Sequence, residues 1–457
     1  MPALLSLLLA LAAPDGSCPA SFGEVVSATE ANYAGYLVKL PDAEAEAAYR
    51  RFRDLLGQRA AASADPAACR DVLTAYVGFF ADHHLFVASD GVEASPLPAP
   101  SRRWTERRIA THLQRHAGQL DPVEGHWYDA EGPLAVLHDP GLPPGRFLAL
   151  RPAGRAAAQP AALVERHGAG YRVSHRQPRF GWQTQPAALR RGGELLAFGT
   201  SGWGRRGAGR LDPGDPMAPL FRDEGDGRYY LSMPSFMPAY REPLAALVAR
   251  HGSELAAARG LLLDVRGNAG GDAIYFVLAP YLLANDIEIG RATSVRASPR
   301  TLQHFTALRE RLGEQGAWLD QPLAAMQASP GAIVPFREGS RDGLPEYPAL
   351  PAEVLVLQDR GVGSAAEAFV YHARQSRKVV TMGEPTRGNI DYMQVSMHRV
   401  GAGDFRYWFG YPLYFARDLP RDSVDDSGYP PDVALTPELG DPVAFALDWL
   451  ERPAAAR

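Results

Sequence analysis

Lysine is almost missing from this sequence: of 47 basic residues only Lys39 and Lys378 are lysines, and the rest are arginines. A mechanism that depends on a lysine amine therefore has only these two candidates. The net charge is −5 in a chain of 457 residues. Because neither sign of charge dominates, the sequence gives no reason to expect binding to nucleic acid or to an anionic membrane surface.

Long apolar runs are also missing. The longest candidate, residues 1–13, is rich in leucine and alanine but is too short to span a bilayer. It resembles the apolar region of a secretory signal peptide, although the usual positively charged start is absent. A signal peptide over 1–13 predicts an exported protein, periplasmic or extracellular; a buried helix is the alternative.

Only two cysteines occur, Cys18 and Cys69. No group of Cys, His, Asp or Glu has the spacing of a metal site, so we expect no metal and no other cofactor. Export to an oxidising compartment favours a disulfide between the two cysteines. The alternative is lipid attachment at Cys18, but residues 14–17 lack the apolar and small residues that such a site needs.

The composition, 46% hydrophobic and 22% charged, is that of a soluble globular protein with two or three domains. Runs rich in Ala, Glu and Arg, with Asp42 as an N-cap, predict helices near the N-terminus. Short apolar runs between turn signals predict a small β-rich module, a curled sheet or half-barrel. Strands alternating with helices, among them Glu242–Ala258 and Asp272–Ala284, predict an α/β core with a mostly parallel sheet. The predicted domains are an N-terminal helical region at 14–118, the β-rich module at 119–210 and the α/β domain at 211–457.

One stretch of the α/β domain combines a strand, a turn and a serine. The apolar run Val354–Leu357 predicts a buried strand, and Gly361 and Gly363 follow it. Ser364 then precedes an alanine-rich run with high helix propensity. Such a serine is either an N-cap or a nucleophile exposed at the end of a strand, and the local pattern leaves both readings open.

Several motifs occur in an order that resembles the tail-specific (C-terminal processing) and tricorn-core serine peptidase family. They are Asp82–His84, Tyr230–Phe236, Leu263–Gly271, Gly363–Glu367, Gly383–Gly388 and Gly428–Asp432. The resemblance implies a crotonase-like α/β core, a polypeptide substrate and a serine peptidase activity. The family's peptide-binding PDZ module is not evident in residues 120–205.

The resemblance also implies roles for single residues. The family's Ser–Lys dyad does not carry over, because Asn389 stands at the position of the lysine. The tricorn-like alternative makes Ser364 the nucleophile, His84 the base and Asp425 the orienting acid, with Asp426 as the alternative acid. The backbone N–H groups of the oxyanion hole would come from Ala365 and from Gly270 or Gly271.

Other interpretations remain beside this one. Glu367 fits a helix-start carboxylate, and His372 is a rival base. The same cleft could hold peptides or apolar ligands without turnover, as in a binding protein, or the same serine could act on esters. The function predicted from the sequence is an exported serine endopeptidase.

Overall fold

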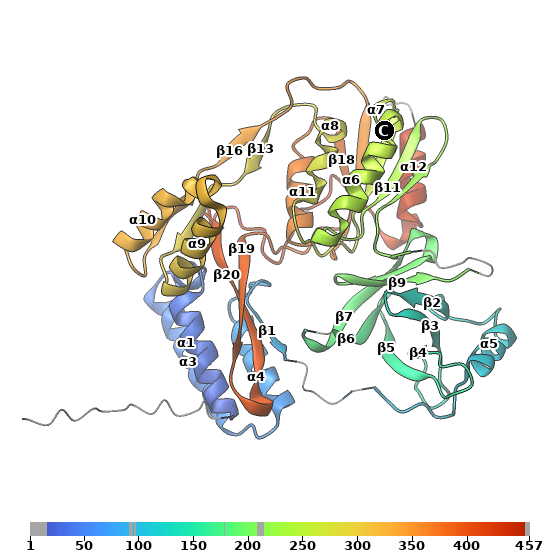
Figure 1. Cartoon of the computed structure of the whole chain (residues 1–457), viewed down its shortest axis with the longest axis horizontal. Helices are drawn as coiled ribbons and strands as arrows, with labels where there is room; N and C mark the ends of the chain where they lie inside the picture. Colours follow the sequence, from blue (N-terminus) through green and yellow to red (C-terminus); the bar gives the residue numbers. More distant parts are fainter. Residues whose placement is uncertain (1–15, 91–94, 96, 178, 208–213, 453–457) are drawn as a thin grey trace, which may run out of the picture.

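The computed structural model describes residues 16–90, 95, 97–177, 179–207 and 214–452. Figure 1 shows three parts: a layered α/β part, a β-barrel, and a group of helices packed on a second sheet. The predicted signal peptide, 1–13, lies outside the described residues. Within those residues, no helix is both long enough and apolar enough to cross a membrane.

A six-stranded sheet forms the α/β part, and all its neighbouring strands are parallel except the edge pair β10–β11. In sheet order its strands are β10 (Leu220–Asp223), β11 (Arg228–Ser232), β12 (Gly260–Asp264), β17 (Glu353–Gln358), β18 (Val379–Gly383) and β21 (Val433–Ala434). Side chains alternate between the two faces of a strand. Accordingly, one face is buried under α6 (Arg241–Arg250) and α11 (Ala365–Ala373), and the other under α12 (Pro442–Glu451). The predicted mostly parallel α/β core is confirmed.

Two predicted helices of this part are wrong in length. Glu242–Ala258 is divided into α6 and α7 (Gly252–Ala256), because glycine at the junction disfavours a continuous helix. Asp272–Ala284 holds only a 3₁₀ turn, η3 (Ile274–Leu278), and the short α8 (Ala279–Leu282). Pro280 lacks the N–H that a continuous helix would need at that position, so the helix restarts beside it.

The β-rich module is an eight-stranded antiparallel barrel, closed because β2 pairs with β9. Its strands are β2 (Gly125–Asp129), β3 (Gly132–Leu137), β4 (Arg146–Arg151), β5 (Gln159–His167), β6 (Gly170–Gln177), β7 (Gly181–Arg190), β8 (Leu195–Phe198) and β9 (Ser201–Arg205). Trp127, Phe198 and Trp203 help to fill the barrel. Helix α5 (Glu106–Arg115) packs on its outside. The barrel is thus more completely closed than the half-barrel predicted from the sequence.

The N-terminal helices share one core with segments from much later in the chain. The helices are α1 (Cys18–Asn32), α2 (Tyr36–Lys39), α3 (Ala43–Ala61) and α4 (Pro66–Gly78). They pack against an antiparallel sheet of β1 (Phe86–Ser89), β14 (Thr293–Arg296), β15 (Ile333–Arg337), β19 (Tyr392–Val400) and β20 (Tyr407–Ala416), with α9 (Pro299–Leu312) and α10 (Asp320–Ala328) alongside. A two-stranded ribbon, β13 (Ile287–Gly290) and β16 (Ser340–Asp342), links this part to the α/β part.

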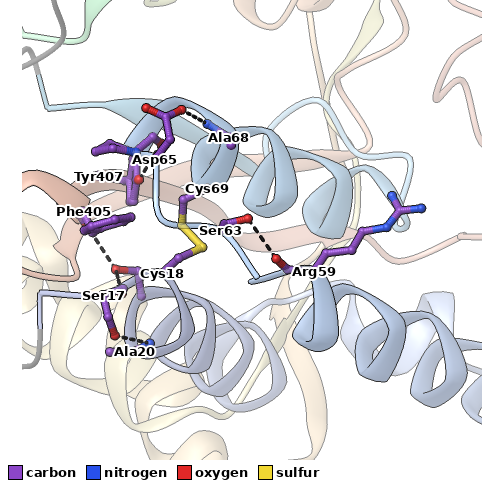
Figure 2. Close-up of a disulfide and its surroundings, with 12 residues drawn as sticks. Ser17, Cys18, Ala20, Arg59, Ser63, Asp65, Ala68, Cys69, Phe405 and Tyr407 are labelled. Carbon is purple, nitrogen blue, oxygen red and sulfur yellow. Dashed lines mark hydrogen bonds between the residues drawn. A yellow bond between two sulfur atoms is a disulfide. The ribbon is translucent and has the colours of Figure 1, made fainter. Parts of the chain in front are cut away.

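The predicted disulfide is present: Cys18 is bonded to Cys69, joining the start of α1 to α4. Figure 2 shows the bridge between the two helices, with Phe405 and Tyr407 beside it. The hydroxyl of Tyr407 donates to the carbonyl oxygen of Pro66 at 2.8 Å. The bridge therefore fixes the two helices where they meet the second sheet. The predicted N-cap is present as well, since Asp42 accepts hydrogen bonds from the first turn of α3.

Candidate active site

Ser364 lies in a sharp turn between β17 and α11, residues 359–364, which we call the serine turn. Its φ is +53° and its ψ −123°, a conformation that costs a residue with a side chain of order 1–3 kcal/mol. Its side chain makes no capping hydrogen bond, so the N-cap reading lacks the bond that defines a cap. Its backbone N–H instead donates to Oδ1 of Asn389 at 2.7 Å. Strain held at a single serine of this kind is typical of functional turns.

Residues 265–271, which follow β12 and which we call the glycine loop, lie directly against Ser364. A Cβ atom placed on Gly270 would come within 2.9 Å of both the Ser364 Cβ and the backbone N of Ala365. Only glycine fits there, because φ at Gly270 is +99°. The N–H of Ala365 opens α11 and has no acceptor within the helix. The N–H of Gly270 donates to Oδ1 of Asn268 at 2.9 Å, so Gly271 is the glycine with the stronger claim to an oxyanion hole.

A buried carboxylate ties α11 to residues 386–392, the bridging segment. Glu367 is fully buried and accepts hydrogen bonds from the Thr386 hydroxyl and from the N–H groups of Gly388 and Asn389, at 2.6 to 2.8 Å. Glu367 lies in the first turn of α11, as the sequence predicted, and these contacts make it an anchor as well. The anchor holds Asn389 where its Oδ1 can accept a hydrogen bond from the N–H of Ser364.

The imidazole of His84 contacts the far end of the bridging segment. Its Nδ1 lies 2.5 Å from the carbonyl oxygen of Tyr392. Since a carbonyl oxygen only accepts, Nδ1 carries the hydrogen, and the neutral ring presents an unprotonated Nε2. The backbone N–H of His84 donates to Oδ1 of Asp82 at 2.8 Å. Burial raises the pKa of Asp82, while His84 and Lys39 act to lower it.

The two candidate acids lie beside the same segment but contact other partners. Asp425 pairs with Lys39, Nζ to Oδ2 at 3.1 Å, and its side chain is 8% exposed. Asp426 pairs with His83 at 3.0 Å and is 59% exposed. The backbone N–H of Asp425 donates to Asp391 at 3.1 Å. The structure thus joins the carboxylate of Asp425 to an ammonium group, and it is a backbone carbonyl that contacts Nδ1 of His84.

The electrostatics single out Asp425 over Asp426. The pKa of Asp425 is raised to about 7, chiefly by burial; Lys39 acts to lower it, while Asp391 and Asp82 contribute to the increase. A carboxyl group that changes charge near neutral pH, within a cluster of other acids, is typical of functional sites.

The bridging segment brings the three predicted residues to one region. Ser364 contacts Asn389, His84 contacts Tyr392, and Asp425 contacts Asp391. Asn389 and Tyr392 are three positions apart, so their Cα atoms are separated by no more than about 11 Å. In the part of the chain that the structure describes, no hydrogen bond joins Ser364 directly to His84, or His84 to the carboxylate of Asp425.

Sequence reasoning gave no role to Asp391 or Lys39. Asp391 is fully buried and accepts from the Ser423 hydroxyl and from the N–H groups of Val424 and Asp425, which fixes the loop of the candidate acid. Lys39 also lies over the ring of Tyr392, 5.0 Å from its centroid. The rarity of lysine was the one signal in the sequence that could have marked Lys39.

The rival base, His372, packs in an aromatic cluster. Its Nδ1 lies 3.1 Å from the hydroxyl of Tyr275, and its ring contacts Tyr275, Phe276 and Tyr371. Burial lowers its pKa to about 4. These contacts are those of a neutral histidine that fills the core.

Comparisons with known proteins identify a related family and related folds. Residues 229–403 match the model of Peptidase family S41. No curated protein matches the chain. Among solved structures, the chain is similar to mature CPAF complexed with lactacystin, with a TM-score of 0.52 and 13% identity over 92% of this chain and 94% of that one. Mature CPAF gives a TM-score of 0.51 and 12% identity over 92% and 93%.

A protein from Parabacteroides merdae covers 97% of this chain and 99% of its own, at a TM-score of 0.46 and 14% identity. At these identities the CPAF structures show a shared fold alone, whereas the family model rests on the sequence. The matched region contains the glycine loop, the serine turn and the bridging segment. Residues 229–403 are therefore similar in sequence to Peptidase family S41, the family that the motifs of the chain resemble.

Proposed function

We propose that this protein is an exported serine endopeptidase in which Ser364 attacks the peptide carbonyl and His84 takes its proton. The observation that carries the proposal is the conformation of Ser364, with φ at +53° and the glycine loop packed against it. A binding protein without turnover would gain nothing from holding a serine in a strained turn. The match of residues 229–403 to Peptidase family S41 agrees with a polypeptide substrate.

In this mechanism His84 accepts the Ser364 proton at Nε2, because the Tyr392 carbonyl holds the hydrogen on Nδ1. Catalytic hydrogen bonds are often long without substrate and shorten in the complex, so the absence of a direct Ser364–His84 bond fits a resting site. The oxyanion formed by the attack would be bound by the N–H groups of Ala365 and Gly271.

Asp425 is the proposed acid of the triad. Its carboxylate, paired with Lys39, would stabilise the imidazolium through its charge, while the Tyr392 carbonyl orients the ring. Asp426, exposed and paired with His83, is less suited because water screens its charge.

Export is proposed from the disulfide. The Cys18–Cys69 bridge is of the kind that forms and persists in oxidising compartments, which agrees with a signal peptide at 1–13. Sequencing the N-terminus of the protein purified from its native host tests this. A chain that keeps residues 1–13 and is found in the cytoplasm contradicts it.

The test of the mechanism is labelling with a serine-directed fluorophosphonate, followed by peptide mapping. We expect the label on Ser364, and none in Ser364→Ala. His84→Ala should slow labelling and peptide hydrolysis by about 10²–10⁴-fold, the usual contribution of a general base. His83→Ala is the matched control and should behave as the wild type.

Two results would count against the proposal. Equal losses in His84→Ala and His83→Ala would show that His84 has no special role. If the wild-type protein is not labelled at any pH between about 6 and 9, the range in which histidine bases work, the protein would be a binding relative. Comparing unstructured polypeptides with p-nitrophenyl esters separates a peptidase from an esterase.

A further inference from the structure

Strand β7 of the barrel contacts both parts of the molecule that supply the proposed site. Just before its start, in the turn between β6 and β7, the Arg179 guanidinium lies over the ring of Trp408 in β20, 4.4 Å from the ring centroid. At its end, Arg190 forms an ion pair with Asp359 of the serine turn. Figure 1 shows the β6–β7 hairpin extending toward β1 and β20. β1 follows His84, so one strand contacts both the base side and the serine side.

The carboxylate of Asp359 joins the two loops of the site. Its Oδ1 accepts the N–H of Gly267, in the glycine loop, at 2.8 Å, and the N–H of Gly361, in the serine turn, at 2.9 Å. Its Oδ2 accepts a hydrogen bond from Nη2 of Arg190. Together with the backbone hydrogen bond from the Gly363 N–H to the Asn268 carbonyl oxygen at 3.0 Å, this side chain sets how the proposed oxyanion loop lies relative to Ser364. The barrel holds the side chain in place through Arg190.

The Arg190–Asp359 pair is shielded from water, with side chains that are 18% and 12% exposed. Removing the guanidinium would leave a carboxylate with reduced access to solvent, which then turns toward other donors or water. The bonds to Gly267 and Gly361 would weaken as it turns. This differs from an exposed ion pair, whose loss is compensated by water.

Docking of the barrel does not depend on Arg190. The neighbouring Arg191 donates to the Ser232 hydroxyl at 3.1 Å and to the carbonyl oxygens of Pro216 and Ala218 at 3.0 and 2.7 Å. These three bonds fix the same end of β7 to the edge of the parallel sheet. A change at Arg190 therefore alters the contact with Asp359 while the barrel stays docked.

We propose that Arg190 is a positioning residue for Ser364, through which the barrel controls the geometry of the site. The inference rests on the proposed function of Ser364. According to this inference, the barrel influences catalysis itself. A displacement of β7 would move Arg190 and would therefore change the turnover rate.

The experiment compares Arg190→Ala and Arg190→Lys with Arg151→Ala. Arg151 also pairs with an aspartate, Asp129 in the same barrel, through two hydrogen bonds at 3.0 and 2.9 Å, away from the site. We expect Arg190→Ala to lower kcat by about 10- to 100-fold, the effect of a displacement near 1 Å, with KM nearly unchanged. Arg151→Ala should keep the wild-type kcat, Arg190→Lys should retain part of it, and added guanidinium should rescue Arg190→Ala alone.

Two further measurements keep the inference separate from the proposed function. Hydrogen exchange at the Gly267 and Gly361 amides should accelerate in Arg190→Ala and not in Arg151→Ala, whether or not the protein hydrolyses anything. In an Asp359→Asn background, Arg190→Ala should cause little further loss, because interacting residues are not additive.

Unchanged exchange at both glycines overturns the inference, as does an equal loss of kcat in Arg190→Ala and Arg151→Ala. A wild-type protein that fails to label at Ser364 while exchange still responds to Arg190→Ala overturns the proposed function and leaves the coupling between barrel and serine turn standing.

Discussion

Replacing Gly270 with alanine is the most direct perturbation of the proposed oxyanion hole. The added Cβ would lie 2.6 Å from the carbonyl oxygen of Gly363 and 2.9 Å from both the Ala365 N and the Ser364 Cβ. Real Cβ contacts are essentially never this short, and all three neighbours are fixed by backbone. The serine turn or the glycine loop must therefore move, and the methyl group would cover the N–H of Ala365.

The expected loss follows from what one oxyanion donor contributes. Removing such a donor lowers kcat by about 10²–10³-fold, or roughly 3–4 kcal/mol of transition-state stabilisation. The substitution also has a conformational cost: alanine at positive φ is less stable than glycine by about 1–2 kcal/mol. Stability and activity must be measured separately to tell the two effects apart.

Gly267→Ala provides the control. Gly267 lies in the same loop with φ at +77°, but a Cβ there would have no neighbour closer than 3.8 Å. Both variants thus carry the strain of an alanine at positive φ, and only Gly270→Ala has the contact with Ser364. We expect both variants to lower the midpoint of urea unfolding, Gly270→Ala by more because of its close contacts, and a large loss of peptide hydrolysis in folded Gly270→Ala alone.

The reasoning is refuted by a Gly270→Ala variant that folds and hydrolyses peptide as fast as Gly267→Ala. That result would mean that the N–H of Ala365 does not bind the oxyanion. Equal and severe losses in both variants would trace the effect to backbone strain instead.

Two further predictions concern stability. Reducing the Cys18–Cys69 bridge opens a loop with a sequence separation of 51 and should lower the free energy of unfolding by on the order of 4 kcal/mol. A variant with both Cys18→Ala and Cys69→Ala is the control, because reductant should not change its stability. An unfolding midpoint of the wild type that reductant leaves unchanged contradicts this prediction. The pKa of Asp425 is raised from 3.8 to about 7. In the pH window between these two values, Asp425 is protonated in the folded state and ionised in the unfolded state. Stability should therefore fall as pH rises through the window, by on the order of 4 kcal/mol for this group, and Asp425→Asn should remove that part of the slope in urea unfolding at about pH 5 and about pH 8. A slope unchanged by Asp425→Asn would show that the group titrates normally.

Local sequence determined much of the α/β part. The apolar runs at β12 and β17 and the helix propensity after Ser364 are properties of neighbouring residues, so their elements could be predicted. Asp42 caps α3 for the same reason, since a cap forms with residues two and three positions away. The predicted helices failed at Gly252 and Pro280, where a single backbone feature outweighs composition.

The site itself was decided by tertiary structure. Residues at 39, 84, 391 and 425 meet only because β19 and β20 pack beside the N-terminal helices while the bridging segment stays anchored to Glu367. Such contacts depend on packing between distant segments, which no short pattern encodes. The sequence alone named the serine and its glycines. Folding decided that Tyr392 fixes the hydrogen of His84, that Lys39 pairs with Asp425, and that the barrel contacts the serine turn.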